Sequence, residues 1–212
     1  RGALRPKWRK GSQLDDNRNL HRKCVPSAGS PNRCPLDNCK LEAIGLIPKC
    51  ISTGQLYLEG ACDVYTTDAS GLAATRAAFE NPGDHVVLPE IISKEPLGPL
   101  VRHGDNQWGD IARWTLNALI AAEELGVTSA NVEELGASAG NNPEINRLLG
   151  TEGTLGEMLG LDADWAKRAI MVNGNYGEIF EANIGENTPI GLARGLNAQW
   201  TEGGLLYSPP FR

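Results

Sequence analysis

Hydrophobic and polar positions alternate over residues 62–67, and a helical pattern begins directly after them. The alternation predicts a strand that ends at Asp68, and the alanine-rich run after it predicts a helix from Ala69 to about Phe79. Residues 85–88 and 97–102 have the composition of two further strands. This succession of short strands and helices predicts the α/β fold class.

Beyond residue 103 the pattern changes to helices. Apolar residues recur at helical spacing over 106–125, with Gly126 placed to end the helix. Shorter helices are expected after Thr128 or Ser129, after Asp162 and over 175–184. The apolar tail, 192–212, is expected to lie across the surface of its domain, and the rings of Trp108 and Trp114 are expected to pack rather than to bind a ligand.

Asp68 is the candidate binding residue because it stands where a strand stops and a helix starts. Ligands of α/β proteins gather at the carboxyl ends of strands. Aspartate is also a favoured helix N-cap, since its side chain accepts a hydrogen bond from the first turn. The local pattern allows both roles.

Charge divides the chain into two parts. Residues 1–50 contain 11 Lys/Arg and 4 Asp/Glu, whereas residues 51–212 contain 9 and 22, so that a net +7 precedes a net −13. The basic part, assigned to 1–54, contains many prolines and four of the five cysteines, and it predicts an irregular segment. Such a segment could bind nucleic acid or a protein partner. Its cysteine spacing lacks the paired knuckles of a zinc site, so no metal is expected.

Five blocks of the sequence resemble the C-terminal portion of the general L-amino-acid-binding periplasmic proteins, which are substrate-binding proteins of ABC transporters with the type 2 periplasmic-binding fold. The likeness runs from about residue 57 to residue 212. It is carried by CDVYTTD (62–68), LPEIISKEPLGP (88–99), NALIAAEELGVTSANV (117–132), NGNYGEIFEANIG (173–185) and RGLNAQWTEGGLLYSPPFR (194–212).

The resemblance implies two periplasmic-binding-protein-like lobes, of which this chain has an incomplete set. Residues 55–95 would end the second lobe, and 96–212 would cross back to the first lobe and add a helical extension. In that family the aspartate after the CDVYTT strand pairs with the α-ammonium of the bound amino acid, so Asp68 is the expected ligand residue. Thr67 and Glu95 are expected to assist it. The residues that hold the ligand carboxylate lie upstream in the family and have no counterpart here.

Disulfide bonding is also implied for Cys62, because the family's cysteine at this position bonds to an upstream cysteine of the same lobe. Which of the four earlier cysteines it meets stays open. Likeness to the family is lost abruptly near residue 55. A chimeric or misread replacement of the upstream sequence is therefore a second explanation of residues 1–54, which peptide sequencing would test.

The function expected from the resemblance is that of a non-catalytic, extracytoplasmic component of an ABC importer. It would clamp a free L-amino acid, polar or acidic, and present it to a membrane permease. The sequence contains none of the G-x-S-x-G, H-E-x-x-H or P-loop motifs, and no cofactor is expected. The sequence has no signal-peptide pattern, so a periplasmic location is expected from the resemblance alone. The alternative is an interaction protein whose basic segment binds nucleic acid or a protein partner.

Overall fold

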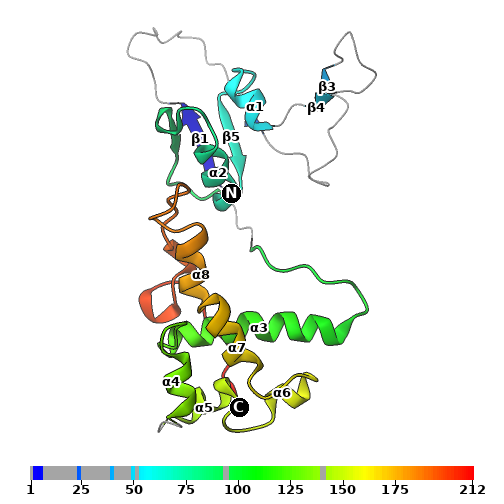
Figure 1. Cartoon of the computed structure of the whole chain (residues 1–212). Helices are drawn as coiled ribbons and strands as arrows, with labels where there is room; N and C mark the ends of the chain where they lie inside the picture. Colours follow the sequence, from blue (N-terminus) through cyan, green and yellow to red (C-terminus); the bar gives the residue numbers. More distant parts are fainter. Residues whose placement is uncertain are drawn as a thin grey trace. The chain divides into compact units, whose positions relative to one another are not determined.

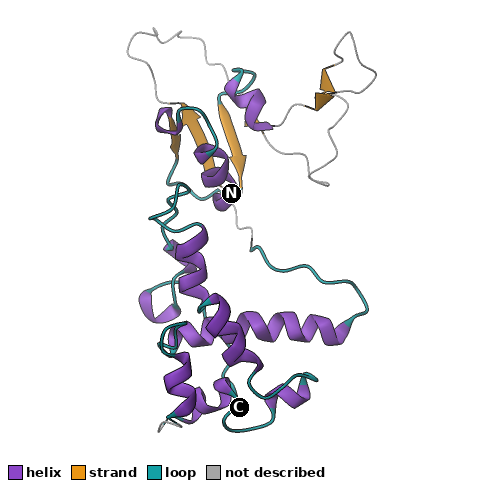
Figure 2. Cartoon of the chain, viewed as in Figure 1, coloured by secondary structure: helices purple, strands orange, loops and turns teal. Residues whose placement is uncertain are grey.

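The chain folds into two units in a computed structural model, Arg1–Pro96 (unit 1) and Leu97–Arg212 (unit 2). The structure describes residues 53–92, 96–138 and 142–212, together with the backbone of four short strands before them. Figure 1 traces the elements in chain order, and Figure 2 shows the strands gathered in unit 1 and the helices that make up most of unit 2. Each unit has its own core.

Unit 1 contains a four-stranded sheet with the order β2-β5-β1-β6. β5 (Val64–Thr67) is an inner strand, antiparallel to β1 (Gly2–Pro6) and parallel to β2 (Lys23–Cys24). β6 (His85–Val87) completes the sheet on the far side of β1. β1 lies in the segment predicted to be irregular. Its hydrogen-bonding partners are more than fifty residues away in sequence, so the local pattern gave no sign of this strand.

Two further strands, β3 (Cys39–Lys40) and β4 (Lys49–Cys50), pair with each other outside this sheet. α1 (Thr53–Leu58) precedes β5, α2 (Ala69–Ala77) follows it, and the 3-10 helix η2 (Pro82–Asp84) leads into β6. A small apolar core joins α1, β5 and α2 through Tyr57, Cys62, Tyr65 and Leu72. This core packs β5 against α2 on both sides of the junction between them.

Unit 2 is helical. Its longest helix, α3 (Asn106–Glu124), has nearly the predicted bounds and ends before Gly126, whose positive φ of 68° suits glycine. The shorter helices are α4 (Val132–Ala137), α5 (Pro143–Leu149), α6 (Leu155–Met158), α7 (Trp165–Asn173) and α8 (Tyr176–Asn183), followed by the 3-10 turns η3 (Gly195–Asn197) and η4 (Trp200–Glu202).

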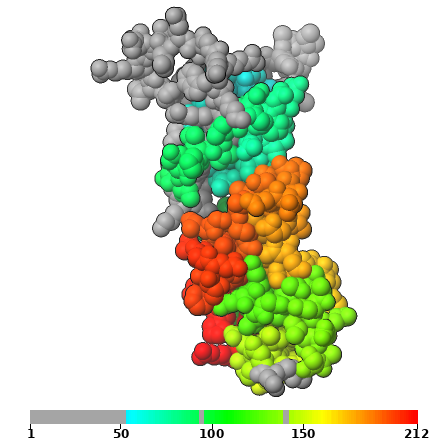
Figure 3. Space-filling view, turned by 90° about the vertical axis from the view of Figure 1, so that its left-hand side faces the viewer, coloured from blue at the N-terminus to red at the C-terminus, as the bar shows by residue number. Residues whose placement is uncertain are grey.

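The core of unit 2 forms where one face of α3 meets the shorter helices and the end of the chain. Phe211 is 3 % exposed in this core, and its ring meets that of Trp114 edge-on at a centroid distance of 5.5 Å. The expectation that the apolar tail lies against the domain is therefore confirmed. In Figure 3 the orange and red residues of α8 and the tail lie against the green residues of the same unit. The fully buried side chains of this core include Ala118, Ala122, Val127, Val132, Leu148, Leu149, Ala166 and Ile170.

Three predictions about unit 2 were wrong. Residues 97–102 form no strand, because no described strand pairs with their backbone and Pro99 has no N–H to donate. The helix expected after Thr128 or Ser129 begins instead at Val132, because the Asn131 side chain accepts a bond from the Thr128 N–H and closes a turn there. Trp108 does not pack as expected but is 56 % exposed. None of the helices in the described part is long and apolar enough to cross a membrane.

Candidate functional site

The candidate site is the junction between β5 and α2 in unit 1. Thr66 is fully buried in the sheet, and the chain emerges at Thr67 and Asp68, which are half-buried. Asp68 has φ −59° and ψ 157° and is the N-cap of α2. The strand therefore delivers a carboxylate to the N-terminus of a helix at a partly accessible position.

The two carboxylate oxygens of Asp68 have different partners. Oδ1 accepts hydrogen bonds from the Ser70 hydroxyl at 2.6 Å and from the Gly71 N–H at 2.7 Å. Oδ2 accepts one longer bond, 3.2 Å, from the Thr67 hydroxyl. Oδ1 thus satisfies the helix terminus, whereas Oδ2 keeps acceptor capacity, since an ionised carboxylate offers about four acceptor positions.

These contacts keep Asp68 ionised. Burial raises the pKa of the carboxyl, but the hydrogen bonds from Ser70, Gly71 and Thr67 outweigh it and hold the pKa below its ordinary value. The helix N-terminus favours a negative charge at the same place. At neutral pH the junction therefore presents a fixed negative charge that can receive a cation.

Gly71 permits the carboxylate to fold over the helix. A Cβ added at this position would lie 2.8 Å from Asp68 Oδ2, which is closer than real Cβ contacts allow, and at a tight 3.2 Å from Oδ1. A side chain here would push the carboxylate away from the first turn. Glycine at this helical position, despite its poor helix propensity, is thus explained by the placement of Asp68.

Of the other predicted site residues, Thr67 lies beside Asp68 as expected and donates to it. Glu95 lies outside the described residues. Cys62 is 5 % exposed and disulfide-bonded, while its partner is not among the described side chains. The structure thus brings Asp68 and Thr67 together, and their role toward a ligand remains a prediction.

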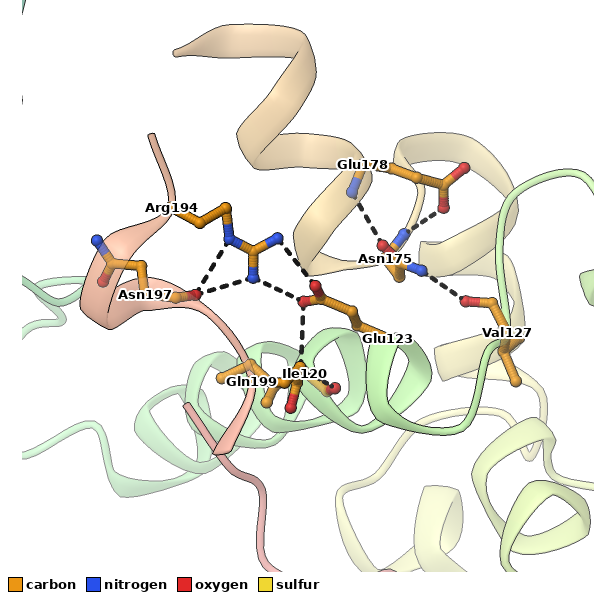
Figure 4. Close-up of polar contacts among 8 residues, drawn as sticks. All are labelled: Ile120, Glu123, Val127, Asn175, Glu178, Arg194, Asn197 and Gln199. Carbon is orange, nitrogen blue, oxygen red and sulfur yellow. Dashed lines mark hydrogen bonds and ion pairs between the residues drawn. The ribbon is translucent and has the colours of Figure 1, made fainter. Parts of the chain in front are cut away.

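A second polar cluster lies inside unit 2 and was not predicted (Figure 4). The Arg194 guanidinium donates to Glu123 Oε1 at 2.8 Å and to Oε2 at 3.1 Å, and its Nε and Nη2 both donate to the Asn197 carbonyl. Both charged side chains are less than one-fifth exposed. The local sequence gives no sign of this ion pair, because the two partners are 71 residues apart in the chain.

This cluster fastens the tail to α3. The buried Gln199 amide donates to the Ile120 carbonyl and to Glu123 Oε2, each at 3.1 Å (Figure 4). The Arg194 guanidinium also lies over the Tyr176 and Phe180 rings. Most N–H groups of Arg194 are therefore already paired. Arg194 is a structural residue and is not free to grip a ligand carboxylate.

A third cluster caps α8. Asn175 and Glu178 form a reciprocal capping box, and the Asn175 amide also donates to the Val127 carbonyl at 2.9 Å (Figure 4). Burial raises the pKa of Glu178, but bonds from Ser129 and Asn175 outweigh it and hold the pKa below its usual range. The N-x-x-E spacing is the sequence signal by which this box could have been found.

Within the described ranges, no group of His, Cys, Asp or Glu side chains could hold a metal ion.

The β5–α2 junction thus places an ionised carboxylate at the carboxyl end of a strand, where ligands of α/β proteins gather. Comparisons with known proteins identify the class of protein. The chain is 69 % identical over 158 residues to the glutamate/glutamine/aspartate/asparagine-binding protein BztA of Rhodobacter capsulatus. The matched region covers 74 % of this chain and 46 % of that protein. It is 58 % identical over 156 residues to the general L-amino acid-binding periplasmic protein AapJ of Rhizobium johnstonii, again 74 % of this chain and 46 % of the relative.

A solved structure agrees with these relatives. The ABC transporter periplasmic binding protein from Brucella ovis with glutathione bound superposes with a TM-score of 0.70 at 56 % identity, over 76 % of this chain and 50 % of that one. Over the matched part, this chain is homologous to the amino-acid-binding periplasmic proteins of ABC transporters and has their fold. The family expected from the sequence is thereby confirmed.

The match covers only part of each relative. The chain spans about half the length of the curated relatives it matches. No protein-family model matches it. The relatives are binding proteins of transporters rather than enzymes, and none of them supports the alternative of an interaction protein that binds nucleic acid.

Proposed function

We propose that this chain acts as part of the periplasmic solute-binding component of an ABC importer for L-amino acids, with Asp68 as the receptor for the ligand's α-ammonium group. The proposal extends to the chain the roles stated in its relatives' names. No bond chemistry is involved: the ligand is clamped between lobes and passed to a membrane permease, so that domain motion is the mechanism.

The observation that carries the proposal is the unequal use of the two Asp68 oxygens. Oδ1 is committed to the α2 terminus, and Oδ2 has one long bond from Thr67. An ammonium group that leaves water needs an ionised, hydrogen-bonded acceptor. Asp68 Oδ2 supplies such an acceptor, and the Thr67 hydroxyl beside it can turn toward the ligand. Glu95 is retained as a third contact on the resemblance alone.

A polar or acidic ligand is the preferred class. The Rhodobacter capsulatus relative is named for glutamate, glutamine, aspartate and asparagine. Glutathione, which is bound in the Brucella ovis structure, has a free α-ammonium on its γ-glutamyl residue. All these ligands can present the same group to Asp68, so glutathione belongs in the test beside L-glutamate.

The test is an NMR titration of the ¹⁵N-labelled chain with L-glutamate and with glutathione. NMR detects binding even at millimolar dissociation constants. This range is needed because the chain spans only about half the length of its relatives, so that fewer contacts to the ligand are expected. We expect saturable shifts of the amides of residues 67–72 and their loss in Asp68→Asn, which keeps an N-cap side chain but removes the charge. Asp105→Asn is the matched control, because Asp105 caps α3 in the same way and should leave binding unchanged.

Two results would contradict the proposal. One is the absence of any saturable shift at residues 67–72 up to tens of millimolar of either ligand. The other is binding that survives Asp68→Asn undiminished. A salt-dependent titration with RNA, in the same samples, would support instead the interaction-protein alternative.

A further inference from the structure

The C-terminal tail, residues 192–212, pairs its backbone with itself. The Trp200 N–H donates to the Leu206 carbonyl at 2.9 Å, and the Leu206 N–H donates to the Ala198 carbonyl at 3.2 Å. Over residues 194–206, every backbone–backbone hydrogen bond that the structure describes joins two residues of the tail. The tail therefore keeps its own fold without extending any of the helices on which it lies.

Two glycines make the turn of the tail compact. Gly203 has a positive φ of 87°, a conformation that suits glycine. A Cβ added at Gly204 would overlap the Ala198 carbonyl, so the backbone can come this close only because the residue has no side chain. A peptide that is already ordered by its own turn loses less conformational entropy on docking than a flexible one.

Side chains, in contrast, attach the start of the tail to the end of α3 (Figure 4). The Arg194 guanidinium pairs with both carboxylate oxygens of Glu123, and the Gln199 amide donates to one of them. Gln199 is only 3 % exposed. The Trp200 indole donates to Glu124 Oε1 at 2.9 Å. Three side chains of the tail thus contact one end of one helix.

The far end of the tail is attached by an aromatic side chain. Phe211 is buried, and its ring meets that of Trp114 edge-on. The Phe211 carbonyl accepts a hydrogen bond of 2.6 Å from Nε of Arg147 in α5. Arginine and aromatic side chains that become fully buried are the usual energetic centres of an interface. The contacts of the tail therefore resemble those of a bound peptide more than those of a further helix of the core.

We call the surface that receives these side chains the tail-docking surface. It consists of Trp114, Ile120, Glu123 and Glu124 of α3 and Arg147 of α5.

We propose that the tail-docking surface is a peptide-binding site, and that the tail remains bound to it when the covalent connection between them is cut. The class of ligand is a preorganised peptide that presents an arginine and, further along, a phenylalanine. Every contact on which the proposal rests lies within unit 2. It is therefore independent of the role proposed for Asp68 in unit 1.

The test cuts the chain before the tail. Glu186 and Asn187 are exposed in the loop that precedes it, and exposed loops tolerate insertions, so a protease site is placed between them. After cleavage of the folded protein, we expect the fragment 187–212 to remain bound during size exclusion in native buffer. The two fragments are then separated in urea. The longer one is refolded with a fluorescently labelled 187–212 peptide, and anisotropy measures the affinity.

We expect 1:1 binding with a micromolar or lower dissociation constant. Arg194→Ala and Phe211→Ala in the peptide should each weaken binding at least ~10-fold, because each removes a side chain that is buried on docking. Leu205→Ala is the control, since Leu205 is 70 % exposed, and it should leave the affinity within about twofold. All three changes are made in the peptide, so the refolded fragment is the same in every titration.

The proposal is overturned if the tail separates from the cleaved protein in native buffer, or if the refolded fragment does not bind the peptide. It is also overturned if the three peptide variants bind equally well. Cleavage that unfolds unit 2 would contradict it too, since the tail would then be an inseparable part of the core. Binding of L-glutamate by the cleaved protein is measured separately and tests only the role of Asp68.

Discussion

Two aspartates cap helices in this chain, one in each unit, and their surroundings differ. Asp68 caps α2 at the end of a buried strand, accepts three hydrogen bonds and folds over Gly71. Asp105 caps α3 at the end of an irregular exposed loop and accepts one bond, from the Trp108 N–H at 3.1 Å. The same local motif thus accepts one hydrogen bond at Asp105 and three at Asp68, where these bonds hold the pKa of the carboxyl below its ordinary value. The difference comes from the strand behind Asp68 and from its neighbours.

The largest expected effect comes from breaking the ion pair between Arg194 and Glu123, a carboxylate that serves only the structure. Arg194→Ala removes the bidentate partner and leaves a mostly buried charge. We expect a loss of about 2–4 kcal/mol in the free energy of unfolding of unit 2. Urea denaturation of the variant measures this loss.

The double replacement Arg194→Met with Glu123→Leu is the control, since it leaves no unpaired charge and should recover most of the stability. A single variant as stable as the parent would show that the ion pair does not fasten the tail to α3.

The two caps themselves are compared by Asp68→Ala and Asp105→Ala. Asp68→Ala should destabilise α2 by about 1–2 kcal/mol, because Gly71 N–H and Ser70 lose their acceptor, while Asp105→Ala should destabilise α3 by about 0.5 kcal/mol. Native-state hydrogen exchange reads each helix separately. Equal losses at the two helices would remove the distinction between the two aspartates.

A glycine near the start of each helix gives a second pair of substitutions with different expected effects on stability. A Cβ at Gly109 of α3 would meet the Val101 side chain at an ordinary 3.6 Å, so Gly109→Ala should stabilise by about 0.5–1 kcal/mol through better helix propensity. Gly71→Ala should gain nothing, because its Cβ displaces the Asp68 carboxylate. Thermal melts of both variants check this, and a stabilising Gly71→Ala would show that Asp68 does not depend on the glycine.

The smallest effect is the pH dependence that Asp68 contributes. Its hydrogen bonds hold the folded-state pKa below that of the unfolded chain, which is about 3.9. Its stabilising contribution is therefore complete above that unfolded-state pKa and is lost as the pH falls through the folded-state pKa. Denaturation of the parent and of Asp68→Asn between pH 6 and pH 2 should show a shallower decline in the variant. Parallel curves would mean that these bonds do not favour the ionised form.

Much of the fold could be predicted where the signal is local. The bounds of α3 follow from its apolar period and Gly126, and the β5–α2 junction follows from alternation that changes to an alanine-rich run. Pairing between distant segments could not be predicted in this way. β1 was missed because its partners are β5 and β6, and residues 97–102 were wrongly assigned to a strand because composition does not supply a partner.

The candidate site also combines a residue that has a local sequence signal with one that depends on a distant partner. Asp68 could be found from the sequence, but the local pattern allowed both a cap and a ligand role, and only the resemblance of residues 62–68 favoured the ligand role. Arg194 could not be assigned, because its partner Glu123 is brought to it only by the packing of the tail on α3. A capping aspartate and a ligand-binding aspartate can have the same local sequence, so a binding measurement is what tests the role proposed for Asp68.

The central claim is that Asp68 receives the ligand's α-ammonium group, and a double-mutant cycle tests it most directly. The affinities of the parent and of Asp68→Asn are measured for L-glutamate and for N-acetyl-L-glutamate, in which the ammonium charge is removed. We predict a coupling of about 2 kcal/mol, so that acetylation weakens binding about 30-fold in the parent and hardly at all in the variant. An equal effect of acetylation in both proteins would contradict the claim.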